Sequence, residues 1–220
     1  MTKPAAKQIF IVDDHPVFRE GLVGLVKREA DLAVCGEADN ASQALSGIES
    51  SKPDLVLADI GLPGKNGLEL VKDIRAVHPE MAVLVISMHD ETLYAERVLR
   101  AGGRGYIMKQ EGPEKILQAI RQVLDGQISL SGKMSARILD SLSDRRAKTD
   151  SPIARLTDRE FEILQLIGQG KDSHDIAELL HLSVKTVDAH RGELMQALGI
   201  HDMAGLVRYA IRTGVISAET

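Results

Sequence analysis

The chain has 220 residues and carries 27 Lys and Arg against 32 Asp and Glu, which gives a formal net charge of −5 at pH 7. With 44% hydrophobic and 27% charged residues the composition is that of an ordinary soluble protein, and the length suits two domains that each bury a core. The single cysteine, Cys35, excludes an internal disulfide, no apolar stretch approaches a membrane span, and residues 1–8 lack the apolar core of a signal peptide, so we expect a cytoplasmic protein.

Five short apolar runs divide the first half of the chain. They are mostly aliphatic, and segments of helical period separate them, which is the pattern of buried parallel strands joined by crossover helices. We therefore predict an α/β domain with a doubly wound, five-stranded parallel sheet in the flavodoxin-like order 2-1-3-4-5. The runs cover residues 9–12, 32–35, 55–58, 82–86 and 105–108.

Four of these runs end at a charged or hydroxyl side chain. In an open parallel sheet ligands bind beyond the carboxyl ends of the strands, so these ends should meet at one cleft. The second run, at the sheet edge, ends without such a group. The residues expected at the cleft are Asp13, Asp14, Asp59, Ser87 and Lys109.

The expected cleft combines three acids with one base. Three crowded carboxylates stay ionised only beside positive charge, and their oxygens suit Mg²⁺, which keeps several waters next to a phosphoryl group. Lys109 can pair with a phosphate, and the Ser87 hydroxyl can donate to a phosphoryl oxygen. No serine, histidine and acid fall together at the strand ends as in a hydrolase triad. The pattern indicates a carboxylate that carries a phosphoryl group as an aspartyl phosphate.

A family resemblance supports this interpretation. The segments 13–16, 59–64 with Gly67, 87–89, and Tyr106 with Lys109 resemble the receiver domain of bacterial response regulators over about residues 9–127. Taken singly, each residue could be structural, and Tyr106 could be a half-buried aromatic with a solvated hydroxyl. The resemblance implies that Asp59 is the phosphoacceptor, that Asp13, Asp14 and Asp59 hold Mg²⁺ with the Gly61 carbonyl, and that Ser87, Tyr106 and Lys109 respond to the phosphate.

The region after the last strand changes in composition. From Ser129 onward the apolar runs give way to a polar stretch that ends near Pro152, apart from a short helix predicted over residues 133–141. That helix could instead be an extension of the preceding one. We place a receiver domain at residues 1–128, a linker at 129–152 and a second domain at 153–220.

Four helices are predicted past Pro152. The first begins at a capping box of Thr157 and Glu160 and ends at Gly168 and Gly170. Two short helices with a tight turn before a longer third helix make a helix-turn-helix. The later helices begin after Asp172 or Ser173, after Ser183 and after Asp202, and the third ends at Gly199.

These helices carry a second resemblance. The segments 156–160, 176–177, 182–187, 190–191 and 198–199 resemble the four-helix DNA-binding domain of the LuxR family, as found in the NarL/FixJ class of response regulators. The resemblance covers about residues 152–216 and implies that residues 202–212 form a dimer face. It further implies that Lys185 and Thr186 contact phosphate, that Asp188, Ala189 and Gly192 face the bases, and that Arg191 also belongs to the DNA interface.

The charge of the second domain favours an alternative. Residues 152–220 contain seven Lys and Arg against ten Asp and Glu, whereas a DNA-binding module usually presents a basic surface. The alternative of an acidic helix bundle that docks a protein partner is therefore kept. Helix N-termini can still bind phosphates, and Asp188 could accept from cytosine N4.

Together the two resemblances imply a transcriptional response regulator and not an enzyme. A sensor histidine kinase would phosphorylate Asp59, and the phosphorylated chain would form a homodimer on double-stranded promoter DNA, with RNA polymerase as a further candidate partner. An aspartyl-phosphate phosphatase of the haloacid-dehalogenase type is the third alternative. Such enzymes place a second aspartate two residues beyond the nucleophile, where this chain has Gly61.

Overall fold

The structure is a computed structural model that describes residues 5–143 and 152–216. The chain divides into two compact units, one up to Ile138 and the other from Leu139 onward. Of the linker expected at residues 129–152, residues 144–151 lie outside the described residues.

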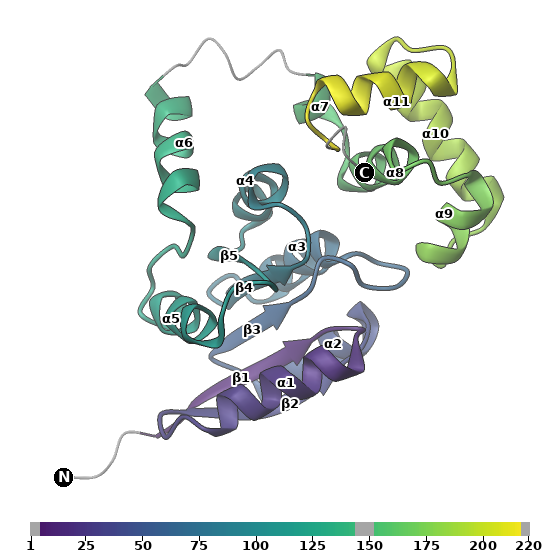
Figure 1. Cartoon of the computed structure of the whole chain (residues 1–220). Coiled ribbons are helices and arrows are strands. Elements are labelled where there is room, and N and C mark those ends of the chain that lie inside the picture. Colours follow the sequence, from purple (N-terminus) through teal and green to yellow (C-terminus); the bar gives the residue numbers. More distant parts are fainter. Residues whose placement is uncertain (1–4, 144–151, 217–220) are drawn as a thin grey trace. The chain divides into compact units, whose positions relative to one another are not determined.

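The first unit is built on a five-stranded parallel sheet (Figure 1). The strand order is β2-β1-β3-β4-β5, which confirms the predicted flavodoxin-like sheet. The strands are β1 (Lys7–Val12), β2 (Leu32–Ala38), β3 (Leu55–Ala58), β4 (Ala82–Ser87) and β5 (Gly105–Met108).

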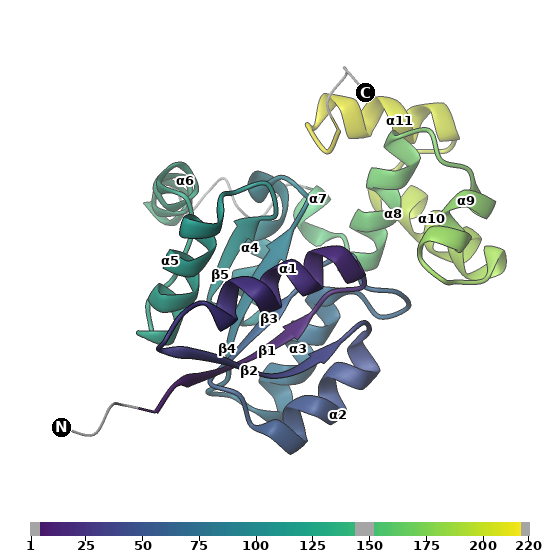
Figure 2. The same ribbon diagram turned by 60° about the horizontal axis from the view of Figure 1, so that its bottom comes forward.

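Helices cover both faces of this sheet (Figure 2). The face of Ile9, Leu57 and Ile86 forms one apolar core with side chains of α1 and α5, including Val26 and Ile120. α2, α3 and α4 pack on the opposite face. Burial on both faces explains why the central strands read as continuous apolar runs without alternation. The helices are α1 (Pro16–Lys27), α2 (Ala41–Ser51), α3 (Gly67–Val77), α4 (Glu91–Ala101) and α5 (Pro113–Leu124).

The edge strand differs from its prediction. We predicted a strand that ends at Cys35, but β2 continues through Gly36 and Glu37 to Ala38, and Asp39 follows it. The statement that this strand ends without a charged group was therefore wrong. An edge strand tolerates glycine and an exposed acid because only one side of it is paired, so the strand is longer than its apolar run.

The sheet register aligns the carboxyl ends of the strands. Val12 pairs with Ala58, and Ala58 pairs with Val85. The first residues past the strands continue this alignment, because Asp59 N–H donates to the Val12 carbonyl at 2.9 Å and Lys109 N–H donates to the Ser87 carbonyl at 2.8 Å. The backbone alone thus brings Asp59 beside the end of β1, and Lys109 beside the end of β4.

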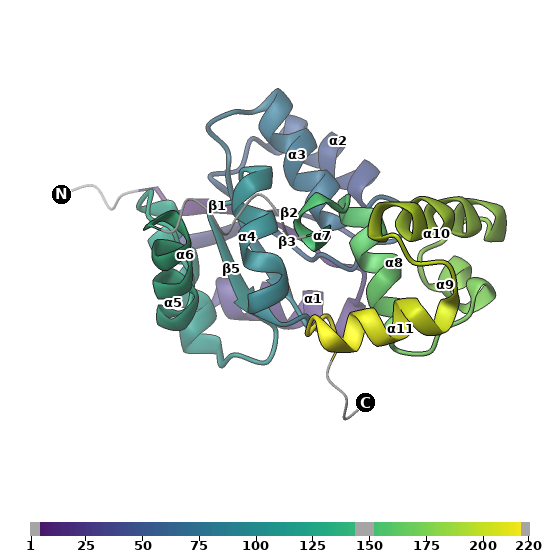
Figure 3. The ribbon, with the colours of Figure 1, turned by 90° about the horizontal axis from the view of Figure 1, so that it is seen from above.

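The second unit contains the four predicted helices, preceded by the short α7 (Pro152–Arg155) (Figure 3). The capping box of Thr157 and Glu160 is confirmed, and Asp172, Ser183 and Asp202 each accept a backbone N–H at the start of the next helix. Val187, Leu194 and Leu206 are fully buried and form part of the core. The helices are α8 (Asp158–Gly168), α9 (Ser173–Leu179), α10 (Val184–Leu198) and α11 (Met203–Arg212).

A further helix, α6 (Gly132–Ser143), includes the segment in which a short helix was predicted. It is separate from α5, since residues 125–131 lie between the two helices. None of the helices in the described ranges is long and apolar enough to cross a membrane.

Gly67 allows α3 to begin directly under the end of β3. A Cβ atom at this position would lie 1.9 Å from the carbonyl oxygen of Asp59, while the Gly67 N–H donates to the Ile60 carbonyl at 2.9 Å. Because a backbone atom cannot move aside as a side chain can, only glycine fits here.

We predict that Gly67→Ala lowers the free energy of unfolding by about 1–3 kcal/mol, the usual cost of forcing an extra methyl group into a packed site. Urea denaturation followed by circular dichroism measures this. Gly21→Ala is the control, because Gly21 is an exposed residue of α1 with no atom within 4 Å of the added Cβ, and it should be neutral or stabilising. Equal stability of wild type and Gly67→Ala would contradict the stated packing.

Candidate functional sites

The carboxyl edge of the sheet holds a compact group of acids. Asp13 and Asp14 follow β1, and Asp59 follows β3. Asp13 and Asp59 are buried, and Asp14 is half-buried. One ligand atom from each of these acids and from His15 can be chosen so that all four lie within 4.8 Å of one another. The structure thus brings together the three acids that the sequence placed at the ends of two different strands.

Lys109 supplies the positive charge in this group. Its Nζ lies 2.7 Å from Asp13 Oδ2 and 2.7 Å from Asp59 Oδ2. The ammonium also sits 4.6 Å from the centre of the Phe18 ring, where it gains a cation–π interaction. Burial raises the pKa of Asp59, whereas Lys109 acts to lower it and Asp13 acts to raise it further. Ionising the Asp59 carboxylate therefore costs free energy in this site, and a further positive charge would reduce that cost.

Two buried oxygens of this group accept no hydrogen bond. Asp13 Oδ2 has Lys109 at ion-pair distance, and Asp14 Oδ1 lies 2.6 Å from His15 Nδ1, but neither receives a donor with hydrogen-bond geometry. Unsatisfied carboxylate oxygens that converge on one point are the donor set that a hard divalent cation uses. The acidic residues present therefore fit Mg²⁺.

Gly61 lies two residues beyond Asp59 at the mouth of the site. It is exposed, and its backbone N–H hydrogen bond to the Asp59 carboxylate lowers the pKa of that group. Gly61 thus sits next to the acids, as the sequence predicted.

Ser87 and Tyr106 lie on neighbouring strands beside the acids. Both are buried, and the Ser87 Oγ accepts the His89 N–H at 3.2 Å. The Tyr106 hydroxyl donates to the His89 carbonyl at 2.7 Å. Burial strongly raises the pKa of Tyr106, so its hydroxyl keeps the proton that it donates. Both side chains therefore hold the loop between β4 and α4.

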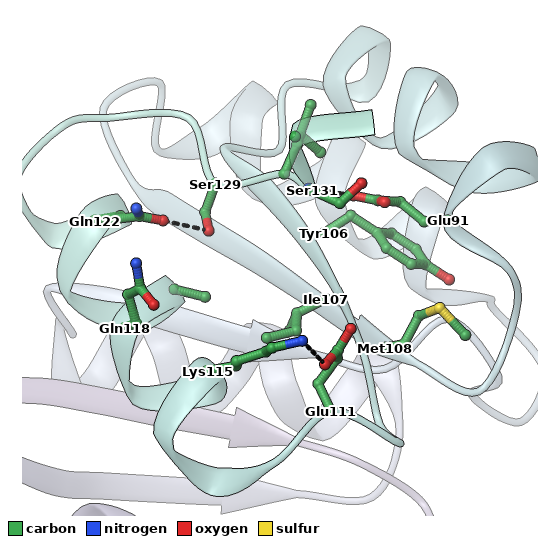
Figure 4. Close-up of a pocket in the computed structure, with 13 residues that line it drawn as sticks. Glu91, Tyr106, Ile107, Met108, Glu111, Lys115, Gln118, Gln122, Ser129 and Ser131 are labelled. Carbon is green, nitrogen blue, oxygen red and sulfur yellow. Dashed lines mark hydrogen bonds and ion pairs between the residues drawn. The ribbon is translucent and has the colours of Figure 1, made fainter. Parts of the chain in front are cut away.

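The chain after α5 returns along the outer edge of β5 (Figure 4). Tyr106 N–H donates to the Ser129 carbonyl at 2.9 Å, so Ser129 extends the sheet by one bridge. Two residues on, the Ser131 N–H donates to Glu91 Oε1 at 2.8 Å, at the first turn of α4. A surface pocket of about 320 Å³ lies between this segment and α5. The strand of Tyr106, the start of α4 and the start of α6 are thus joined through Ser129 and Ser131.

The long helix of the second unit presents a polar face. Val187 and Leu194 point into the core, and the remaining positions leave an exposed surface. Thr186 is half-buried at the helix start, where its hydroxyl lies 2.8 Å from Ser183 Oγ. Lys185, Asp188, Ala189 and Gly192 are exposed, and Arg191 is half-buried.

Comparisons with known proteins identify both units. A family model of the response regulator receiver domain matches residues 9–121, and a model of bacterial regulatory proteins of the luxR family matches residues 154–210. The oxygen regulatory protein NreC of Staphylococcus haemolyticus is 34% identical over 210 residues, which cover 93% of this chain and 97% of that protein. The chain belongs to the NarL/FixJ class of response regulators.

Solved structures of other response regulators are similar. A LuxR-family two-component response regulator from Aurantimonas sp. SI85-9A1 is 32% identical with a TM-score of 0.59, and the match covers 63% of this chain and 99% of that one. RcsB from Salmonella enterica, solved bound to a promoter in the presence of the phosphomimetic BeF₃⁻, is 23% identical with a TM-score of 0.63 and shares the fold over 92% of this chain and 97% of that one.

Several contact residues were missed from the sequence. Phe18 under Lys109, Glu91 at the start of α4, and Ser173 at the start of α9 were not predicted at a site. Ser173 had been considered only as a helix cap, a role that Asp172 fills. No local pattern distinguishes these residues, because each acts through a partner far along the chain or on another helix.

The opposite environments at the two ends of β3 give a test based on pH. Asp54 lies just before β3, and burial alone would raise its pKa, but hydrogen bonds from the Gln8 backbone and from Lys7 lower it overall. Asp59 lies just after β3, and burial raises its pKa. A raised pKa in the fold means that stability is lost as pH rises above the ordinary value of 3.8. A lowered pKa means that the added stability is fully present above 3.8 and is lost as pH falls below that value.

We therefore predict that, with divalent ions chelated, Asp59→Asn is more stable than wild type at pH 7.5 and that this advantage shrinks toward pH 4. Asp54→Asn should be less stable than wild type at pH 7.5. Urea midpoints at the two pH values measure both effects. A loss of stability at pH 7.5 in Asp59→Asn would show that its pairing with Lys109 outweighs burial.

Proposed function

We propose that this response regulator accepts a phosphoryl group on Asp59 and, once phosphorylated, binds promoter DNA as a dimer to regulate transcription. The observation that carries the proposal is the ion pair of Lys109 with both Asp13 and Asp59 in a buried group of acids. This arrangement leaves a carboxylate ready to react, with a cation already in place for the charge that arrives.

The phosphoryl group would come from a phosphohistidine of a sensor histidine kinase. An oxygen of Asp59 bonds to phosphorus, the P–N bond to the histidine breaks, and the imidazole nitrogen keeps the bonding electrons and takes up a proton. Mg²⁺, held by Asp13, Asp14, Asp59 and the Gly61 carbonyl, would neutralise phosphoryl oxygens. Beside Lys109, α1 and the start of α5 line a groove of about 690 Å³ that leaves room for the donor, with Val17 85% exposed at its rim.

The new phosphoryl group would change the partners of Lys109 and Ser87. The Lys109 ammonium can leave the Asp59 carboxylate oxygen and pair with a phosphoryl oxygen instead. The Ser87 hydroxyl, which accepts from the His89 N–H, can turn its own proton toward the phosphate. Because Tyr106 holds the His89 carbonyl, a movement of this loop changes what Tyr106 contacts. On this proposal the receiver would have two states, and phosphorylation would bias the balance between them.

The exposed face of α10 would enter the major groove. Lys185 and Thr186 at its start would contact phosphate, Asp188, Ala189 and Gly192 would face the bases, and Arg191 would complete the interface. α11 would pair with its copy in the dimer, and two α10 helices would then read half-sites about one helical turn apart. RNA polymerase is the further partner that we propose for the bound dimer, and the cytoplasm is the compartment that we propose.

A second candidate function rests on charge. The three-acid excess of residues 152–220 is unusual for a DNA-binding module and suits a bundle that docks a protein partner. On that alternative phosphorylation of Asp59 would be unchanged, and only the target of the second unit would differ. Salt-dependent binding to duplex DNA separates the two functions.

The phosphoacceptor assignment is tested with the acids at the two ends of β3. We predict that acetyl phosphate with Mg²⁺ adds one phosphoryl group to wild type and to Asp54→Asn, and that Asp59→Asn stays unmodified. Asp54 lies at the opposite end of the strand, so its replacement removes the same charge without touching the site. Intact-protein mass spectrometry counts the added groups. Undiminished labelling of Asp59→Asn would overturn the assignment.

The DNA function is tested by affinity and its salt dependence. Few basic side chains lie on α10, so one domain should bind weakly with a shallow salt slope, since each phosphate contact adds about 0.9 to that slope. Pairing two domains should raise affinity by about 10² without new contacts. We predict weak binding by residues 152–220 alone, much tighter binding by the phosphorylated chain, and near loss of both in Lys185→Ala.

Lys27→Ala, an exposed charge change on α1, is the control for this experiment and should leave affinity unchanged. Fluorescence anisotropy with duplexes selected from a random pool supplies the measurements. The proposal fails if phosphorylation gives no gain, or if Lys185→Ala binds as wild type does.

A further inference from the structure

Three side chains at the meeting of α9 and α10 form a cluster, and the proposed function does not use the contacts that they make with one another. The Ser173 Oγ donates to Asp188 Oδ1 at 2.9 Å, and Arg191 Nη1 donates to the same Ser173 Oγ at 2.8 Å. Arg191 Nη1 also lies 3.5 Å from Asp188 Oδ1. We call these three residues the Ser173 cluster. In it one hydroxyl connects the acid and the base of the proposed DNA-reading face.

The Ser173 cluster removes much of the positive potential of that face. Lys185 and Arg191 are the two Lys or Arg residues of α10, and Arg191 is turned to an acid. The imidazole ring of α10 belongs to His190, whose Nδ1 lies 3.2 Å from Glu193 Oε2. Lys185 is exposed at the helix start, and no ion pair within the described ranges is assigned to it. A phosphate that approaches Arg191 therefore meets a guanidinium already paired and a carboxylate that repels it.

The cluster is weak enough to open for a suitable partner. The side chains of Asp188 and Arg191 are 48% and 33% exposed, and exposed ion pairs are only marginally stabilising. Arbitrary duplex DNA offers Arg191 a phosphate but leaves Asp188 beside other phosphates. A site that offers Asp188 a donor, such as cytosine N4, satisfies both groups at once.

We infer that Asp188 is a specificity-determining residue that acts through Arg191, because it lowers affinity for arbitrary duplex DNA and leaves the matching site able to bind. This inference rests on the proposed DNA-binding function. It replaces the expectation that Asp188 only faces a base with a role for its charge inside the protein. The same arrangement explains how a domain with few basic residues can still discriminate between DNA sequences. Weak non-specific binding increases the ratio of the affinity for the matching site to the affinity for other sites.

The test compares two acids of the same unit in the phosphorylated full-length chain. Asp188→Asn keeps an oxygen for the Ser173 hydroxyl but removes the charge next to Arg191. Glu178→Gln makes the same change of net charge at an exposed position of α9. The probe is a random-sequence duplex, and its affinity is measured by anisotropy over a series of salt concentrations. Thermal melting checks that the variants fold as wild type does.

Asp188→Asn should bind the random duplex about fivefold more tightly than wild type, with a salt slope steeper by about 0.9, the contribution of one additional phosphate contact. Glu178→Gln should stay close to wild type. In the double variant Asp188→Asn/Arg191→Gln the gain should disappear, because the freed guanidinium is its source. The ratio of affinities for a selected duplex and for the random pool should fall in Asp188→Asn.

The contrary outcomes separate this inference from the function on which it rests. Equal effects of Asp188→Asn and Glu178→Gln, or a gain that survives Arg191→Gln, would show only a bulk charge effect and would overturn the inference while DNA binding stands. Failure of all four proteins to bind any duplex at low salt would overturn the proposed DNA function and this inference with it.

Discussion

The structure of the receiver unit depends on one ammonium group. Lys109 Nζ contacts both Asp13 and Asp59 at 2.7 Å in a buried site, where neither carboxylate could be accommodated as an unpaired charge. The parallel register makes this contact possible, because it brings the ends of β1, β3, β4 and β5 to one edge. In the proposed function an added phosphoryl group would compete for the same ammonium, so the signal would change the interaction that neutralises the buried acids of the resting fold.

From this site the contacts lead outward through a short series of hydrogen bonds. Ser87 and Tyr106 hold the backbone of His89, and the next turn carries Glu91, which accepts the Ser131 N–H ahead of α6. The segment between α5 and α6 is therefore a packed part of the receiver edge up to at least Ser131. At the other end of the chain, the Ser173 cluster pairs an acid with a base on the proposed DNA-reading face. The low charge of that face predicts weak resting affinity for DNA and a strong response to the pairing of two domains.

How far the sequence could predict this protein depends on how local each feature is. Apolar runs and helix caps are local, so the strands of the sheet and the helix starts at Thr157, Asp172, Ser183 and Asp202 were predicted and confirmed. The sheet order is not local; it was taken from the flavodoxin-like fold that the alternating pattern indicated, and it is confirmed as well. The full length of β2 was missed, because Gly36 and Glu37 break its apolar pattern. The bridge from Ser129 to Gly105 and the contacts of Ser173 join residues from different elements. The local sequence around these residues contains no pattern that predicts the contacts.

We propose that Lys109 transmits the phosphorylation of Asp59 to the rest of the receiver, beyond any part it has in receiving the phosphoryl group. The most direct measurement is sedimentation of Lys109→Gln and wild type after treatment with acetyl phosphate and Mg²⁺, with the phosphoryl content of each sample fixed by mass spectrometry. At matched phosphorylation, wild type should sediment as a dimer and Lys109→Gln as a monomer. A phosphorylated Lys109→Gln that dimerises as wild type does would contradict the account.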